Sequence, residues 1–187
     1  MLFEKNKFPM NIFIVFEKVK PVVYTSQTLT SNHFVCLIPS NWYKNINIFM
    51  KNELFLATTF LVDSTIIDLL KYNDNIMFLN EKKRFLKYNI YYTYMLKNRL
   101  TLLQLFKTPT LDTIDNIYYN SSWLERENSE MYGINYINKK DNRSLLLDYS
   151  RNEYPMLKDF PTEGYDEIYF DFFENKINYI KNEFIEL

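Results

Sequence analysis

The hydrophobic residues of this chain recur with two periods, which predict a mixture of strands and helices. Continuous apolar runs at 34–38 and 55–62 are typical of buried strands, and a third short run follows at 66–70. Ser40 is expected to cap a helix over 41–51, because the apolar residues there fall at helical spacing. The apolar face of this helix would comprise Trp42, Ile46, Phe49 and Met50.

Residues 84–96 alternate between two faces, which predicts a strand. Lys87 and Asn89 fall on the polar face, and the turn signal Lys97-Asn98 precedes a second apolar run at 100–106. The two runs together predict a β-hairpin. The apolar face of its first strand would comprise Leu86, Tyr88, Ile90, Tyr92 and Tyr94.

Pro109 is expected to open another helix with an apolar stripe. That stripe would comprise Leu111, Ile114, Ile117 and Tyr118. The order of elements predicts an α+β fold: a two-layer sandwich with a mostly antiparallel mixed sheet, helices on one face, and an extended irregular C-terminal arm. We expect a weakly defined extension at 1–32, a core domain at 33–147 and an interaction arm at 148–187.

Residues 123–165 combine many charged side chains with both glycines of the chain. Ser122 and Glu125 fit a capping box, so a helix of about three turns is expected to follow. Gly133 would end that helix in the left-handed conformation. A segment with such a demanding backbone path and so much charge is where function is to be sought.

Within this helix the charged residues admit a structural and a catalytic interpretation. Arg126 and Glu130 lie four residues apart, which favours a weak ion pair. Glu125 and Glu127 would point roughly 200° apart around a helix, so they cannot share one substrate. Structural or interfacial roles are therefore favoured over general acid–base chemistry, and Trp123 is expected to lie in the core.

The periodicity stops after residue 148, apart from a strand-like alternation at 167–172. Pro155 stiffens the path, and Pro161 begins a turn that ends at Gly164. Long irregular segments in compact domains usually bind something. Aromatic residues set among prolines and charges predict an interface here; these are Tyr149, Tyr154, Phe160 and Tyr165.

Composition narrows the possible functions. The net charge of −1 argues against a nucleic-acid binder, which needs a basic surface. Cys36 and His33 are the only residues of their types, too few for an iron–sulfur cluster or a zinc site of soft ligands. Cys36 is interpreted as inert core and His33 as a structural residue at a strand end.

Two further classes are excluded by what the sequence lacks. The two glycines lie thirty-one positions apart and cannot form a phosphate-binding loop. The apolar runs are shorter than the ~18–20 residues that a membrane helix needs. We therefore expect no cofactor on this chain, and membrane contact only through partners. Abundant Asn, Ile, Lys, Tyr and Phe with a single Ala indicate an AT-rich, organellar genome.

Residues 125–165 carry charged and aromatic motifs at fixed spacings. The first comprises Glu125-Arg126-Glu127, Glu130, Met131-Tyr132, Lys139, Arg143 and Leu145-Leu146. The second comprises Asp148-Tyr149, Pro155, Lys158-Asp159-Phe160-Pro161 and Gly164-Tyr165. This series resembles the 30-kDa subunit family of respiratory complex I, and the likeness extends over about 33–172. The family usually has Gly where Glu153 stands.

The resemblance implies a non-catalytic core subunit of the peripheral, matrix-facing arm of the proton-pumping NADH:ubiquinone oxidoreductase of the mitochondrial inner membrane. Such a subunit would pack on the 49-kDa subunit, hold the quinone-reducing module together and support electron transfer from NADH to ubiquinone. FMN and the iron–sulfur clusters would belong to partner subunits. Trp123 and Gly133, with the two series of motifs, would be interface residues, and Lys158-Asp159 a buried charge anchor between subunits.

Other functions stay open at this point. One is a subunit of a related quinone oxidoreductase or of a membrane-bound hydrogenase. A second is a stand-alone enzyme in which Glu125, Asp148 or Asp159 acts on a small substrate. A third is a free-standing adaptor outside any redox complex.

Overall fold

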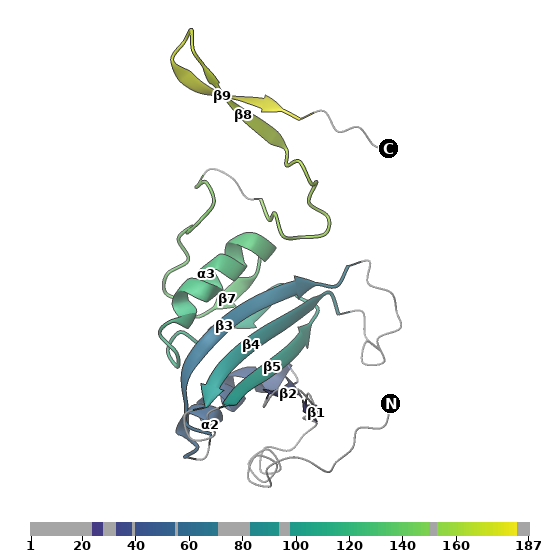
Figure 1. Ribbon diagram of the computed structural model, residues 1–187, viewed down its shortest axis with the longest axis vertical. Coiled ribbons are helices and arrows are strands. Elements are labelled where there is room, and N and C mark those ends of the chain that lie inside the picture. The colour runs from purple at the N-terminus through teal and green to yellow at the C-terminus, as the bar shows by residue number, and fades with distance from the viewer. Residues whose placement is uncertain are drawn as a thin grey trace.

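The computed structural model describes residues 24–27, 33–38, 40–54, 56–70, 83–93, 98–149 and 153–182. The elements are β1 (Tyr24–Gln27), β2 (His33–Ile38), the 3-10 turn η1 (Ser40–Trp42), α2 (Tyr43–Asn52), β3 (Thr58–Asp68), β4 (Phe85–Thr93), β5 (Asn98–Phe106), β6 (Thr110–Asp112), α3 (Ser121–Tyr132), β7 (Asn135–Ile137), β8 (Asp166–Asp171) and β9 (Lys176–Lys181). Figure 1 shows their arrangement in space.

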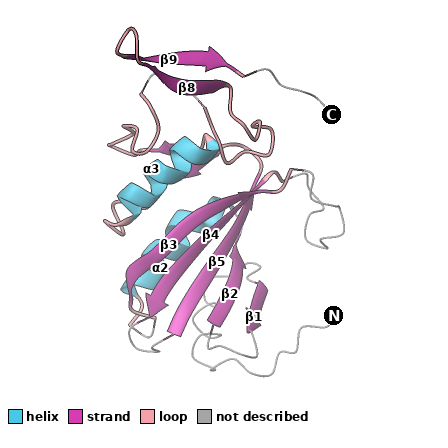
Figure 2. Cartoon of the chain, turned by 45° about the horizontal axis from the view of Figure 1, so that its top comes forward, coloured by secondary structure: helices cyan, strands magenta, loops and turns pink. Residues whose placement is uncertain are grey.

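The main sheet has five strands in the order β1-β2-β5-β4-β3. Its pairs are antiparallel except for β2 and β5, which are parallel. Two small sheets, β6–β7 and β8–β9, complete the described part of the chain. The predicted α+β class with a mostly antiparallel mixed sheet is confirmed, and Figure 2 shows the helices beside the sheet and the β8–β9 hairpin apart from it.

The predicted hairpin of residues 84–96 and 100–106 is confirmed as β4 and β5. Its faces were predicted the wrong way round, because Lys87, Asn89 and Tyr91 are the buried residues of β4 and Tyr92 is exposed. The alternation was correct, but the buried face contains polar groups: the Asn89 amide donates to the Tyr43 hydroxyl, and the Lys87 ammonium lies over the Tyr43 ring. Tyr94 and Lys97 lie outside the described residues.

The helix predicted after Pro109 is wrong. Residues there form β6, which pairs in parallel with β7, and a series of turns. The backbone groups that a helix would use are engaged elsewhere: Asn135 N–H donates to the Pro109 carbonyl at 2.8 Å, and the Ile114 N–H donates to Glu125. All four residues of the predicted apolar stripe are nevertheless buried.

The helix predicted over 41–51 is confirmed in substance, as η1 and α2. Ser40 does not cap it, since its hydroxyl donates to the Leu105 carbonyl at 2.9 Å. Ile46 and Met50 are buried as expected, whereas Trp42 is 38% exposed. Cys36 is buried, and desolvation raises the pKa of its thiol to about 12, as expected of an inert core residue.

Helix α3 covers the edge strand β3. The side-chain amides of Asn120 and Asn128 donate to the carbonyls of Leu61 and Ser64, the second at 2.8 Å. Leu124 packs on the core cluster of α2, whereas Met131 and Tyr132 pack on a second cluster around Ile66, Phe85 and Phe106. The long edge strand is thereby closed to further strand pairing along this part.

Candidate functional site

Helix α3 holds the charged motif and faces the sheet. It ends at Gly133 with φ of 69°, as predicted. The predicted capping box is wrong, because the N-cap residue is Asn120, whose side chain makes no capping bond to the helix, and the Glu125 carboxylate points into the core instead. Because the Glu125 carboxylate accepts hydrogen bonds from Thr113 and Ile114, it does not accept one from the first turn of the helix.

Glu125 and Lys139 form a fully buried ion pair, with 3.1 Å between Nζ and Oε2 and no exposed area on either side chain. The carboxylate also accepts from the Thr113 hydroxyl at 2.6 Å and the Ile114 N–H at 2.9 Å. Lys139 donates further to the Ser122 carbonyl at 2.9 Å. Burial of such a pair is tolerable because both charges have additional hydrogen bonds.

Lys87 lies in the same interior and has no hydrogen-bond acceptor among the described residues. Its ammonium stands 4.7 Å from the ring centres of both Tyr43 and Tyr136. Desolvation lowers the pKa of Lys87 to about 8, and the negative charge of Glu125 opposes that shift. The polar interior, which we define as Lys87, Glu125, Lys139 and their contacts, is therefore held together by ring faces as well as by hydrogen bonds.

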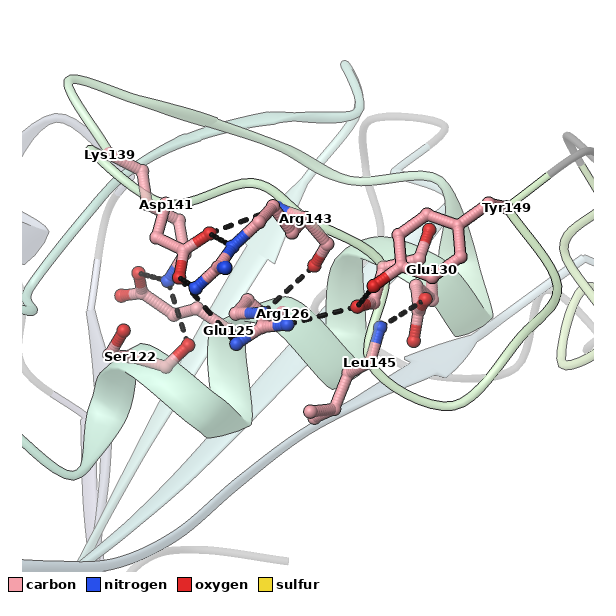
Figure 3. Close-up of polar contacts among 10 residues, drawn as sticks. Ser122, Glu125, Arg126, Glu130, Lys139, Asp141, Arg143, Leu145 and Tyr149 are labelled. Carbon is pink, nitrogen blue, oxygen red and sulfur yellow. Dashed lines mark hydrogen bonds and ion pairs between the residues drawn. The ribbon is translucent and has the colours of Figure 1, made fainter.

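Arg126 and Glu130 do not pair as predicted; each binds the backbone of the loop that follows β7 (Figure 3). Arg126 donates to the carbonyls of Arg143 and Ser144 at 2.8 and 2.9 Å. Glu130 accepts from the N–H groups of Leu145 and Leu146 at 2.6 and 2.8 Å. Desolvation would raise the pKa of Glu130, but these amides hold it below its ordinary value.

Trp123 is 62% exposed, so its predicted place in the core is wrong. Side chains two positions apart on a helix point in roughly opposite directions. Because Glu125 points inward, Trp123 points outward. The Arg126 guanidinium stands 5.4 Å from the centre of the indole ring. Trp123 and Glu127 thus lie on the outer face of α3.

The first part of the C-terminal arm is fixed against α3. The Met156 N–H donates to the Met131 carbonyl at 3.1 Å. The Tyr154 ring lies so close to Gly133 that an added Cβ would stand 3.0 Å from it. Gly133 is therefore required twice, for its left-handed backbone and for the close approach of the arm.

A carboxylate at the end of β3 ties the arm to the main sheet. Asp68 has a fully buried side chain and accepts from the Lys158 N–H at 3.1 Å and from Arg84 at 3.0 Å. Arg84 also binds Asp159 at 2.6 Å. We call Asp68, Arg84 and Asp159 the latch. It gives Asp159 a partner within this chain, while the predicted role of Lys158-Asp159 between subunits stays a prediction.

The comparisons with known proteins agree on one family. The model of "Respiratory-chain NADH dehydrogenase, 30 Kd subunit" matches residues 35–166. NADH-ubiquinone oxidoreductase subunit 9 of Paramecium primaurelia is 37% identical over 96% of this chain and 87% of the relative. The chain belongs to the 30-kDa subunit family of respiratory-chain NADH dehydrogenase.

Solved structures show the same fold at low identity. A fragment of Nqo5 has a TM-score of 0.56 at 18% identity and covers 71% of this chain and 96% of its own. A chain of an archaeal membrane-bound sulfane sulfur reductase has a TM-score of 0.64 at 15% identity, over 81% of this chain and 84% of that one.

A second sequence relative is NADH-ubiquinone oxidoreductase subunit 9 of Paramecium tetraurelia. It is 36% identical over 96% of this chain and 87% of the relative.

In this member of the 30-kDa family the first charged motif is an internal brace. Glu125 and Lys139 form the buried pair, and Arg126 and Glu130 hold the loop at 143–146. Arg143 itself binds Asp141 at 2.9 Å.

The arm motifs lie at different depths. Pro161 and Gly164 form the predicted turn, closed by a bond of 3.1 Å between the Gly164 N–H and the Pro161 carbonyl. The rings of Phe160 and Tyr165 meet edge-on at 5.1 Å. Tyr149 is 79% exposed. Asp148 is also exposed, and Pro155 lies half-buried beside Tyr154.

The three carboxylates that the alternative enzyme would use are engaged in different ways. Glu125 is buried with both oxygens bonded, Asp159 belongs to the latch, and Asp148 lies on the surface. Across the described ranges, no three His, Cys, Asp or Glu side chains are grouped so that they could hold a metal ion, and no helix there is long and apolar enough to cross a membrane.

Sequence reasoning missed Lys87, Asp68 and Arg84 as parts of the site. Lys87 could have been found because a lysine and an asparagine on one face of a central strand are unexpected unless that face is polar inside. Asp68 and Arg84 flank the connection between β3 and β4 and carry opposite charges, which is a weaker signal.

Proposed function

We propose that this chain is a non-catalytic structural subunit of the peripheral arm of NADH:ubiquinone oxidoreductase. It packs on the 49-kDa subunit and holds the quinone-reducing module together, so that electrons pass from NADH to ubiquinone through other subunits. FMN and the iron–sulfur clusters belong to those partners. The chain lies on the matrix side of the mitochondrial inner membrane, reaches the membrane only through the complex, and is encoded in the organelle.

The observation that carries this proposal is the state of the β8–β9 hairpin. Its apolar residues are exposed, among them Phe172 at 86% and Phe173 at 101%. A two-stranded sheet with no third strand or covering helix is marginal in water. Figure 1 shows it at the far end of the molecule from the N-terminal part of the main sheet. Such a segment supports a scaffold whose arm is completed by another chain.

The test is a deletion of residues 166–182 from the full chain, produced together with the other subunits of the quinone-reducing module. We expect the deleted chain to keep its core fold, seen as unchanged thermal unfolding, and to be lost from the particle on a native gel. Flavin and iron–sulfur spectra of that particle identify the complex. Normal incorporation of the deleted chain would contradict the scaffold role of the arm.

A further inference from the structure

The register of the β8–β9 hairpin gives it two chemically different faces. Ile168 stands opposite Tyr179, and Phe170 opposite Ile177. Because side chains alternate along a strand, these four share one face. The Phe172 ring meets Phe170 edge-on at 5.2 Å and extends this apolar face to the tip. We call these five residues the docking face.

The opposite face is mostly polar. Its residues are Glu167, Tyr169 and Asp171 from β8, and Lys176, Asn178 and Ile180 from β9. Asp171 is taken up by the turn, where its carboxylate accepts the N–H groups of Phe173 and Glu174. This side of the hairpin therefore suits contact with water.

The docking face is open. Ile168, Phe170, Ile177 and Tyr179 are 57%, 45%, 60% and 52% exposed. A continuous apolar patch of this kind, rimmed by polar residues, is typical of a protein–protein contact.

The charge around this face selects its partner. Residues 163–182 carry five acidic side chains against two lysines, a net charge of −3, whereas the whole chain has −1. One of the lysines, Lys176, is paired with Glu174. Two copies of the hairpin would bring like charges together, which opposes self-association, whereas a basic rim on the partner would be attracted.

We infer that the hairpin binds through its docking face to a protein surface that is apolar at its centre and positively charged around it. The polar face remains toward solvent. This assignment depends on the function proposed above for the identity of the complex, in which the 49-kDa subunit is the expected bearer of that surface.

Two isoleucines provide a matched pair for the test. Ile177 lies on the docking face and Ile180 on the polar face, with 60% and 54% exposure. Each is changed to Asn in the full chain, which is produced with the other subunits of the quinone-reducing module. The measured quantity is the share of the chain that migrates with the module on a native gel.

We expect Ile177→Asn to lower that share about tenfold, as for loss of a buried anchor. Ile180→Asn should stay within about twofold, because its side chain faces solvent. Equal losses, or a larger loss for Ile180→Asn, would overturn the assignment of the face. If the deletion of 166–182 blocks incorporation while both Asn variants assemble, the face is wrong and the scaffold role stands. If the deleted chain also assembles, the scaffold role fails first.

The charge requirement has its own measurement. Binding of the purified chain to a module that lacks it should slow as salt is added. Asp166→Asn, at the end of β8 and on the same side as Ile168, should slow binding at low salt and weaken the salt dependence. Faster binding at high salt would refute a basic rim. Sedimentation of the purified chain tests whether the docking face instead binds a second copy. A dimer that Ile177→Asn converts to a monomer, together with normal incorporation of this variant into the module, would show that it does.

Discussion

The polar interior and the β8–β9 hairpin depart from ordinary burial in opposite directions. Beneath α3, the charged side chains of Lys87, Glu125 and Lys139 have no exposed area. In the hairpin, isoleucines and aromatic residues are exposed, although contact of such apolar side chains with water is unfavourable. The first departure is resolved within the chain by ion pairing, hydrogen bonds and ring faces. The second has no such resolution within the part of the chain that the structure describes.

The comparison teaches where to expect stability and where to expect assembly. A buried charge with several partners makes a fold intolerant of local change, because removing one partner leaves the others unsatisfied. An exposed apolar hairpin contributes little to the fold of its own chain and much to a complex. Substitutions in the two regions should therefore separate the free energy of unfolding from incorporation into the complex.

The largest effect on stability is expected at Glu125. Glu125→Gln leaves Lys139 as a buried charge without its counter-ion, so the free energy of unfolding should fall by about 3–5 kcal/mol. Urea denaturation of the full chain measures this. Glu127→Gln is the matched control, since Glu127 is exposed on the same helix, and it should change stability by less than about 0.5 kcal/mol. Similar losses for both would show that the buried pair is not what braces α3.

A pH-dependent effect is expected at Lys87. Burial lowers its folded pKa to about 8, from an ordinary value of 10.5. Between these values the unfolded chain binds more protons than the folded chain, so this lysine makes stability rise with pH. Below pH 8 its burial opposes folding by about 3 kcal/mol.

Lys87→Met should remove that opposition, because the methionine is unbranched and apolar. The measurement is the difference in unfolding free energy between wild type and variant, from pH 7 to pH 11. Burial also raises the pKa of Cys36, Tyr43 and Tyr91, and taking the difference removes the contribution that these groups make in both proteins. It should favour the variant at pH 7 and shrink toward pH 10.5. A constant difference would mean that Lys87 does not titrate as described.

Arg84 connects the two regions, because the latch holds the arm on the sheet. Arg84→Met should lower the free energy of unfolding by about 1–2 kcal/mol, since Asp68 keeps two backbone donors and Arg84 is partly in solvent. Hydrogen exchange at Lys158 should accelerate, because its N–H bonds the Asp68 carboxylate. Arg99→Met, at an exposed position of β5, is the control that should leave this amide protected.

The same latch should respond to acid. Desolvation alone would raise the pKa of Asp68, but Arg84 and the N–H groups of Leu70 and Lys158 bring it below its ordinary value. Asp68 therefore contributes stability above the unfolded pKa of about 3.9, and this is lost as pH falls through the lower folded value. Hydrogen exchange at the Lys158 amide measures this. If the amide lost its protection already near neutral pH, the lowered pKa of Asp68 would be contradicted.

The arrangement of elements followed well from the sequence where one period was sustained. The β4–β5 hairpin and α3 with its Gly133 end were predictable because alternation and a left-handed stop are local properties. The helix expected after Pro109 was wrong because long-range pairing of β6 with β7 and the bond to Glu125 took its backbone groups. A local pattern carries no information about such distant donors.

The site was predictable as a segment and not as a set of contacts. The charges of residues 125–143 identified the right region, yet Glu125 was assigned to a helix cap and Trp123 to the core. Both errors come from the direction in which α3 faces, which is fixed by Thr113 and Lys139 from other parts of the chain. Lys87 was placed on the wrong face for the same reason, because the sequence shows alternation but not which face is covered.

The smallest effect on stability is expected at Trp123. This residue tests whether an exposed side chain next to the polar interior serves assembly rather than stability. Its ring is 62% exposed and contacts Arg126, so Trp123→Ala should change the free energy of unfolding by less than about 0.5 kcal/mol. Tyr119, 88% exposed just before α3, provides the control Tyr119→Ala. If the outer face of α3 is an interface, as the family resemblance implies, Trp123→Ala should lower incorporation on a native gel while Tyr119→Ala does not. Unchanged incorporation with lowered stability would instead assign Trp123 to the brace, and partner contact would be confined to the arm.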